Sequence, residues 1–137
     1  MREGKNLKHL GSQSTQYGYK EPDIKTLETF ENKYPMTDYK IKFIFHEMTS
    51  LCPKTGQPDF GTIKITYIAN QKCIETKSLK LYLFEYRQHG AFMETTINKI
   101  LDDLVAVCLP RQMKVTGNFN PRGGIFINVQ AKYKQQI

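Results

Sequence analysis

The chain has 137 residues, of which 39% are hydrophobic and 24% charged, and its formal net charge is +7. This length favours one domain with a core of its own, and this composition is typical of an ordinary globular protein. No apolar run reaches the ~18 residues that a membrane-spanning helix needs, and residues 1–20 carry no apolar stretch of the kind found in a secretory signal. We therefore expect a cytoplasmic protein with one domain, residues 1–137, whose first residues (about 1–22) form a polar extension.

The positive charge admits nucleic acid, anionic lipid or phosphate-bearing molecules as partners. The lysines are scattered, however, and no block of five like charges occurs. This pattern favours a cationic solvated surface over a dedicated nucleic-acid patch.

Three cysteines, Cys52, Cys73 and Cys108, are present, and no CxxC pair occurs among them. An odd number without a secretion signal argues against a disulfide framework. A zinc site needs about four closely spaced nitrogen or sulfur ligands, and the three histidines do not supply them. We expect no metal, and each cysteine is considered as a separate thiol.

In chain order, apolar residues at three-residue spacing predict a short helix over residues 24–34. From residue 39 the pattern alternates, which predicts a strand over 39–46. The stretch TSLCPKTGQPDFG, residues 49–61, contains two prolines and two glycines and predicts a long loop. A second alternating strand follows over 62–69, so the two strands are expected to pair antiparallel.

From residue 78 the apolar residues recur with the period of a helix. SLKLYLFEYRQ, residues 78–88, predicts a first helix, and the apolar stripe over 97–108 predicts a second that ends before Pro110. Two more strands are expected at 113–119 and 125–131, joined by a turn at Asn-Pro-Arg-Gly-Gly.

The expected order is β-β-α-α-β-β, in an α+β domain with a four-stranded antiparallel sheet. Two helices cover one face of such a sheet and leave two open edges. A subunit of this kind often completes its burial against copies of itself, so we expect a homo-oligomer.

Cys52 differs from the other two cysteines because it lies in the Pro- and Gly-rich stretch. Exposed backbone N–H groups in such a stretch can stabilise a thiolate, and Asp59 follows seven residues later. The two residues could form a nucleophile and a proton-transfer partner, or an ordinary loop cysteine and a turn carboxylate. Cys108 lies on the apolar stripe of the second helix and is expected to be a core thiol.

Two further stretches combine polar groups. CIETKSLK, residues 73–80, lies where a helix begins, and its hydroxyls and lysines suit either a phosphate or plain helix capping. Glu94 lies in the first turn of the second helix, where it either complements the helix dipole or grips a pair of N–H donors on a ligand.

Three stretches, TSLCPKTGQPDFGTIKITYI, CIETKSLKLYLFEYRQHG and NPRGGI, together resemble the short form of the NADPH-dependent 7-cyano-7-deazaguanine reductases. These enzymes are the nitrile reductases of queuosine biosynthesis, a tRNA-modification pathway. The resemblance runs from about Leu10 to Ala131. It implies the tunnelling fold, in which the sheets of several subunits join into a barrel of decamer type. It also implies a cytoplasmic enzyme that uses NADPH, two per turnover, and contacts neither nucleic acid nor membrane directly.

The resemblance also implies roles for individual residues. Cys52 matches the thiol that adds to the nitrile carbon as a thioimide, and Asp59 matches the residue that protonates the nitrogen. Glu94 matches the carboxylate that holds the guanine-like edge of the substrate. The family commonly has His where this chain has Met93, so a proton role for that position is not implied.

Further positions match binding residues of the family. The segment Ile74, Glu75 and Thr76 matches substrate contacts of the family, in which the last place is usually Ser or Leu. Met93 also matches a substrate-binding position. The cations expected to contact the NADPH phosphates are Lys77, Lys80 and Arg122. Because no GxGxxG stretch follows a strand, NADPH would bind without a Rossmann unit.

Two alternatives remain at this level. A pterin- or GTP-cyclohydrolase-like enzyme would share the fold but normally carries a zinc-binding Cys/His set. A cationic nucleic-acid-binding module is supported by the charge and by eight tyrosines, and salt-dependent RNA binding would distinguish it.

Overall fold

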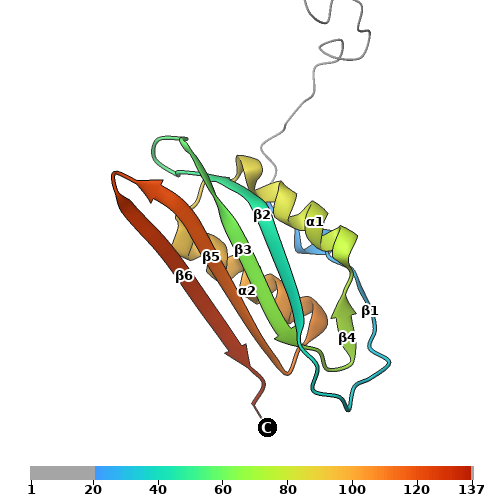
Figure 1. The fold of residues 1–137 in the computed structure, drawn as a ribbon. Coiled ribbons are helices and arrows are strands. Elements are labelled where there is room, and N and C mark those ends of the chain that lie inside the picture. The colour runs from blue at the N-terminus through green and yellow to red at the C-terminus, as the bar shows by residue number, and fades with distance from the viewer. Residues whose placement is uncertain (1–20, 137) are drawn as a thin grey trace, which may run out of the picture.

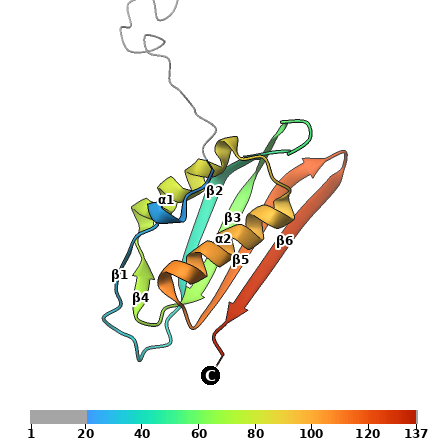
Figure 2. The ribbon, with the colours of Figure 1, turned by 180° about the vertical axis from the view of Figure 1, so that it is seen from behind.

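The computed structural model describes residues 21–136 of the chain. The polar extension expected over about residues 1–22 therefore lies almost entirely outside the described residues. An antiparallel sheet of four long strands forms one layer, and both α-helices lie on one of its faces (Figures 1 and 2). The sheet has the strand order β2-β3-β5-β6, where the strands are β2 (Ile41–Leu51), β3 (Pro58–Ile68), β5 (Gln112–Arg122) and β6 (Ile125–Lys134). The expected α+β class is confirmed, and the four strands of this sheet and the two α-helices follow one another in the expected β-β-α-α-β-β order.

The helical layer follows the predicted periodicity. It consists of α1 (Thr76–Phe84), a 3-10 turn η2 (Glu85–Gln88) and α2 (Met93–Cys108). Apolar residues of α2 that recur every three or four positions, such as Ile97, Ile100 and Leu104, are fully buried. They pack onto the inner face of the sheet, because a helix with one apolar stripe buries that stripe against a neighbouring layer. α2 ends at Leu109, whose φ of 48° places it in the left-handed region immediately before Pro110.

The helix predicted over residues 24–34 is wrong beyond its first turn. A 3-10 turn, η1 (Ile24–Thr26), is followed by a short strand, β1 (Thr29–Glu31), which pairs antiparallel with β4 (Lys72–Ile74). The apolar spacing of three residues fits one helical turn but also fits this extended segment. The partner that stabilises the extended form lies more than forty residues away, with Phe30 opposite Cys73.

The long loop predicted over residues 49–61 is also wrong, because β2 and β3 continue through most of it. Thr49 pairs with Phe60 and Leu51 with Pro58, so only residues 52–57 form the turn. Pro58 is tolerated as the first residue of its strand. Gly61 lies within β3, at a position that only glycine fits, because a Cβ there would collide with the backbone carbonyl oxygen of Asn118.

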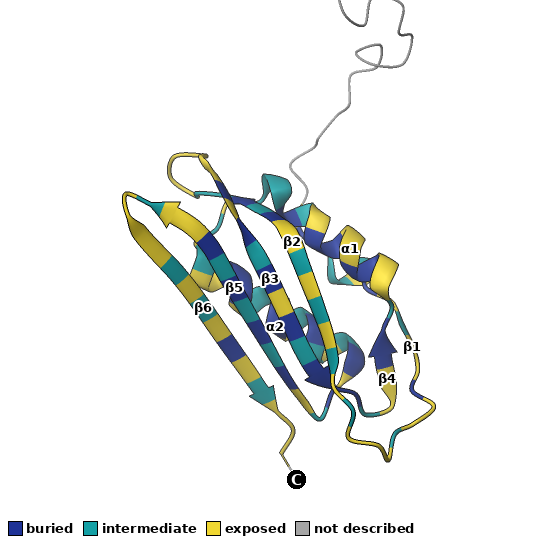
Figure 3. Ribbon diagram, in the orientation of Figure 1, coloured by how far each residue is buried: buried dark blue, intermediate teal, exposed yellow. Residues whose placement is uncertain are grey.

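A β-bulge in β2 changes which residues face the helices. The register shifts between Phe45 and Met48, where two residues of β2, His46 and Glu47, oppose one of β3, Thr62. Before the bulge the odd-numbered Phe43 and Phe45 face inward, whereas after it Met48 and Ser50 are buried. Figure 3 shows the resulting alternation of buried and exposed residues along the central strands, and the more exposed edge strand β6.

The small β1–β4 sheet is fixed to the core by Tyr67, whose hydroxyl accepts a hydrogen bond of 2.9 Å from the backbone N–H of Ile74. Both residues are about 1% exposed. Tyr67→Phe should lower the free energy of unfolding by about 1–3 kcal/mol, because it leaves a buried N–H without a partner. Urea unfolding measures the change, with Tyr34→Phe as the matched control, since Tyr34 is 69% exposed. Equal stability of the two variants would contradict this role.

Candidate functional site

One end of the sheet gathers both hairpin turns and the beginning of α2 (Figures 1 and 2). A pocket of about 150 Å³ lies there. The residues that line it come from the β2–β3 turn and β3, from the end of β5, and from the entry to α2: Cys52, Pro53, Asp59, Ala91, Phe92, Met93, Glu94 and Arg122. This pocket brings together five of the residues expected to act in a site, namely Cys52, Asp59, Met93, Glu94 and Arg122.

The β2–β3 turn holds Cys52 in a defined position. The Cys52 N–H donates to the Gln57 carbonyl at 2.9 Å, and the Gly56 N–H donates to the Cys52 carbonyl at the same distance. Gly56 has a φ of +70°, a conformation that glycine adopts without the steric cost of a Cβ. The Thr55 hydroxyl accepts from the Gln57 N–H at 3.2 Å. The turn is therefore closed by its own backbone and presents a half-buried thiol.

The surroundings of Cys52 favour its thiolate. The Thr55 hydroxyl, followed by the backbone N–H groups of Thr55 and Lys54 and by the charge of Arg122, lowers the pKa of the Cys52 thiol below its usual value. These contributions outweigh partial burial, which acts in the opposite direction. Burial instead raises the pKa of the Cys108 thiol to about 12. Cys108 is 1% exposed and packs in the core as expected, so Cys52 is the cysteine whose surroundings suit a nucleophile.

Asp59 lies near the start of β3, on the inner face of the sheet, and is 6% exposed. Arg122 Nη2 lies 2.6 Å from its Oδ1. The same nitrogen donates to the carbonyl oxygen of Pro58 at 2.9 Å, which ties the end of β5 to the start of β3. The ion pair falls outside the angles of a normal hydrogen bond, and within residues 21–136 no donor makes such a bond to Oδ1. The carboxylate is thus fixed by charge and keeps acceptor capacity for a ligand.

Ser50 is a residue that the pattern of the sequence did not single out. It lies directly opposite Asp59 in the β2–β3 ladder and is fully buried. Its hydroxyl has no hydrogen-bond partner in the part of the chain that the structure describes. The bulge in β2 turns this hydroxyl inward, and no local feature of the sequence reveals a bulge at that place.

A backbone clamp brings α2 to Cys52. The Leu51 N–H donates to the His89 carbonyl at 3.0 Å, and the Ala91 N–H donates to the Leu51 carbonyl at 3.1 Å. These bonds place residues 89–91 parallel to the end of β2. The half-buried Met93 and the exposed Glu94, in the first turn of α2, therefore lie at the same pocket as Cys52.

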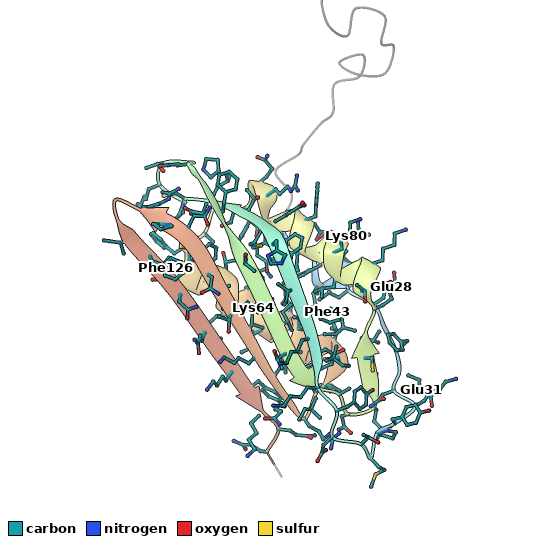
Figure 4. The ribbon with its side chains drawn as sticks, viewed as in Figure 1. Glu28, Glu31, Phe43, Lys64, Lys80 and Phe126 are labelled. Atoms are coloured by element: carbon teal, nitrogen blue, oxygen red, sulfur yellow. The ribbon has the colours of Figure 1, made fainter. Side chains whose placement is uncertain are left out.

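The residues expected at the beginning of α1 do not line this pocket. Ile74 is 1% exposed and belongs to the core. The Glu75 carboxylate caps α1 by accepting from the Lys77 N–H at 2.9 Å and the Ser78 N–H at 2.8 Å. Thr76, Lys77 and Lys80 are exposed on α1, where Figure 4 labels Lys80. Their expected roles as ligand contacts stay predictions.

Within residues 21–136, no three His, Cys, Asp or Glu side chains lie close enough together to hold a metal ion. None of the helices in this range combines the length and apolar character needed to cross a membrane.

Comparison with known proteins gives consistent results. The family model described as "QueF-like protein" matches residues 58–137. The NADPH-dependent 7-cyano-7-deazaguanine reductase of Nitrosococcus oceani is 56% identical over 80% of this chain and 84% of its own length. The enzymes of the same name from Streptococcus mutans and Neisseria meningitidis are 53% and 55% identical, over 94% and 90% of this chain and 79% and 78% of their own lengths.

A solved structure has the same fold. The apo form of the archaeosine synthase QueF-Like superposes with a TM-score of 0.65, over 72% of this chain and 96% of its own, at 19% identity.

Cys52 should react faster with iodoacetamide than Cys73 and Cys108, which are 4% and 1% exposed. We expect one carbamidomethyl group per native chain, located on Cys52 by peptide mass mapping, and three groups after unfolding. Preferential labelling of Cys73 or Cys108 in the native protein would contradict the assignment.

Thr55→Val should move the pH profile of this alkylation to higher pH. The variant removes the hydroxyl that contributes most to lowering the pKa of Cys52. A thiol with a higher pKa needs a higher pH to form the reactive thiolate. The matched control is Thr49→Val, a hydroxyl lost from the exposed face of β2. A profile that moves as much in the control as in Thr55→Val would show that the Thr55 hydroxyl is not responsible.

Proposed function

The chain belongs to the QueF-like family of NADPH-dependent 7-cyano-7-deazaguanine reductases, and we propose on this basis that it reduces 7-cyano-7-deazaguanine to 7-aminomethyl-7-deazaguanine with NADPH. The product would serve queuosine biosynthesis and so tRNA modification. The observation that carries the proposal is the meeting of Cys52, Asp59 and Glu94 at one pocket, in a chain that is more than half identical to enzymes of that name.

The first chemical step uses the lowered pKa of Cys52. The thiolate adds to the nitrile carbon, so that a carbon–sulfur bond forms and one carbon–nitrogen π bond breaks. The Asp59 carboxylate takes up the proton that the Cys52 thiol releases and passes it to the nitrogen, which gives a neutral covalent thioimide. The half-buried thiol and the buried carboxyl line the same pocket, as this division of roles requires. Arg122 keeps the carboxyl in place during the exchange of protons.

NADPH, when bound, would supply one hydride per molecule, so two molecules in turn would take the carbon from nitrile to amine. The carbon–sulfur bond would break between the two reductions, which returns Cys52 as a free thiolate. The chain offers suitable groups for its phosphates. Lys77 and Lys80 are exposed, three residues apart on one side of α1, and neither is ion-paired with a described residue. Arg122 is already engaged by Asp59 and by the carbonyl oxygen of Pro58, so we propose that it acts on NADPH mainly through its charge.

We propose that residues at the beginning of α2 recognise the substrate. Glu94 is an exposed carboxylate at the pocket, and a carboxylate can accept from two adjacent N–H groups such as those of a guanine-like ring edge. Met93 lies beside it, where it supplies apolar contact and no proton. The side chain therefore takes no part in acid–base chemistry, and we assign that chemistry to Asp59 alone.

A second copy of the chain would complete the site. Ile74, Glu75 and Thr76 lie at the other end of α1 from the Cys52 pocket, so we propose that they serve the pocket of a neighbouring subunit in a decamer-type barrel. Ile74 would act there by anchoring the segment in the core. The open edges β2 and β6, together with Ile125 and Phe126 at 73% and 60% exposure, support such assembly. Closure between subunits would also exclude water from the imine formed between the two reductions.

The proposed substrate is a free base, so direct contact with nucleic acid is not part of the reaction. We propose a cytoplasmic location because the free thiol of Cys52 remains reduced in that compartment.

The purified protein should consume about two NADPH per nitrile reduced, because two hydrides are needed to reach the amine. Intact mass after incubation with the nitrile alone should show one adduct per chain, and Cys52→Ala should remove both the adduct and the turnover. Cys108→Ala is the control, and it should keep the adduct. An adduct that survives in Cys52→Ala, or flat NADPH absorbance with folded wild-type protein, would refute the proposal.

Glu94→Gln should raise KM about tenfold or more with a smaller change in kcat, because a hydrogen bond to a charged group contributes about 1.5–3 kcal/mol. Asp102→Asn, an equal change of charge on the exposed side of α2, should leave both constants near wild type. If KM is the same in Glu94→Gln and wild type, Glu94 does not hold the substrate.

A further inference from the structure

The open face of the sheet, opposite the helices, carries much of the positive charge of the chain. Because side chains alternate along a strand, Lys42, Lys64, Lys114, Lys132 and Lys134 share this outer face, while their neighbours in sequence face the core. Figure 4 labels Lys64 on the face turned to the viewer. Glu47, at the bulge, and Asp59, on the inner face, are the acidic residues of these four strands.

The register aligns three of these lysines in one row across all four strands. Lys42 pairs with Thr66, Thr66 with Lys114, and Lys114 with Lys132. Residues directly opposite in an antiparallel pair have Cβ atoms about 4.5–5.5 Å apart, and like charges in such a pair are destabilising. The pair Lys114–Lys132 therefore costs stability unless an anion offsets it.

Within residues 21–136, no carboxylate neutralises this row. The lysines and arginines that do form ion pairs lie elsewhere, in the pairs Lys99–Asp103, Arg111–Asp38 and Arg122–Asp59. Asp38, the acidic residue that precedes β2, is held by Arg111.

A groove of about 580 Å³ lies over this end of the sheet, far along the strands from the Cys52 turn. Its volume is in the range of small-molecule sites. The charged residues that line it are all cationic: Lys40, Lys42, Lys114, Lys132 and Lys134. Thr66, Gln112 and Tyr133 add neutral hydrogen-bonding groups to the lining.

We propose that this lysine groove is a second binding site, which takes a compact polyphosphate anion. A single carboxylate or monophosphate would leave most of the five ammonium groups without a counter-charge, whereas a chain of two or three phosphates can contact several of them together. Lysine binds phosphate as a point charge with three donors. A concave site of this size suits such a small anion better than a nucleic-acid duplex. The anion can be inorganic polyphosphate or the phosphate chain of a nucleotide. The site is independent of the reaction proposed for the Cys52 pocket.

The test is isothermal titration of the full chain with inorganic tripolyphosphate, at fixed ionic strength. Wild type should bind it saturably, and Lys114→Gln/Lys132→Gln should bind it at least tenfold more weakly. The control Lys25→Gln/Lys33→Gln removes the same net charge from exposed positions outside the groove and should stay within twofold of wild type. Without tripolyphosphate, the groove variant should also melt at a higher temperature than wild type, because the opposed lysines no longer repel.

Competition with ATP distinguishes the two sources of the anion, inorganic polyphosphate and a nucleotide. Displacement of tripolyphosphate by ATP supports a nucleotide ligand, and binding that ATP leaves unchanged supports inorganic polyphosphate. The proposal is overturned if wild type shows no saturable binding, or if the two double variants lose affinity equally. It is also overturned if only single-stranded RNA binds in a way that depends on Lys114 and Lys132.

Discussion

The two backbone hydrogen bonds of Leu51 with His89 and Ala91 determine where the site lies. They join the end of the first hairpin to the segment that leads into α2, and they are the connection that places Glu94 at the pocket of Cys52. Peptide groups make this link, so it depends on the course of the backbone and tolerates many side chains. The Arg122–Asp59 ion pair adds a second link, between the two hairpins. Helix, first hairpin and second hairpin thus meet at one end of the sheet.

Much of the fold could be predicted from local pattern. The stripe of α2 and the alternation in β3, β5 and β6 fall where the sequence indicates, because one face of each element is buried in the single core. The failures have a common cause. The strand β1 and the outer part of the β2–β3 hairpin are stabilised by cross-strand partners, which composition does not reveal. Prolines and glycines suggest a break at residues 53–61, and yet the ladder continues to Leu51 and Pro58.

The site was predictable to a different degree for each residue. Cys52 and Asp59 are close because a tight turn joins their strands, so their separation of seven residues along the chain is informative. The proximity of Glu94 depends on the Leu51 clamp, and Ser50 depends on the bulge, neither of which has a local signal. The roles assigned to these residues came from the family resemblance, since a thiol and a carboxylate on a hairpin are compatible with many chemistries.

The bulge in β2 changes which residues face the interior, from odd-numbered positions before it to even-numbered positions after it. Removing one residue at His46 or Glu47 would take away the extra residue of the bulge, so that Met48 and Ser50 would still face the interior in an unbroken alternation that starts at Phe45. Lengthening the tip of the hairpin at residues 53–56 would leave the pairing of β2 with β3 unchanged. Insertions and deletions in this region therefore differ in their consequences: at the tip they alter the geometry around the sulfur, whereas a one-residue deletion at the bulge removes the local bend of β2 and keeps the same side chains enclosed.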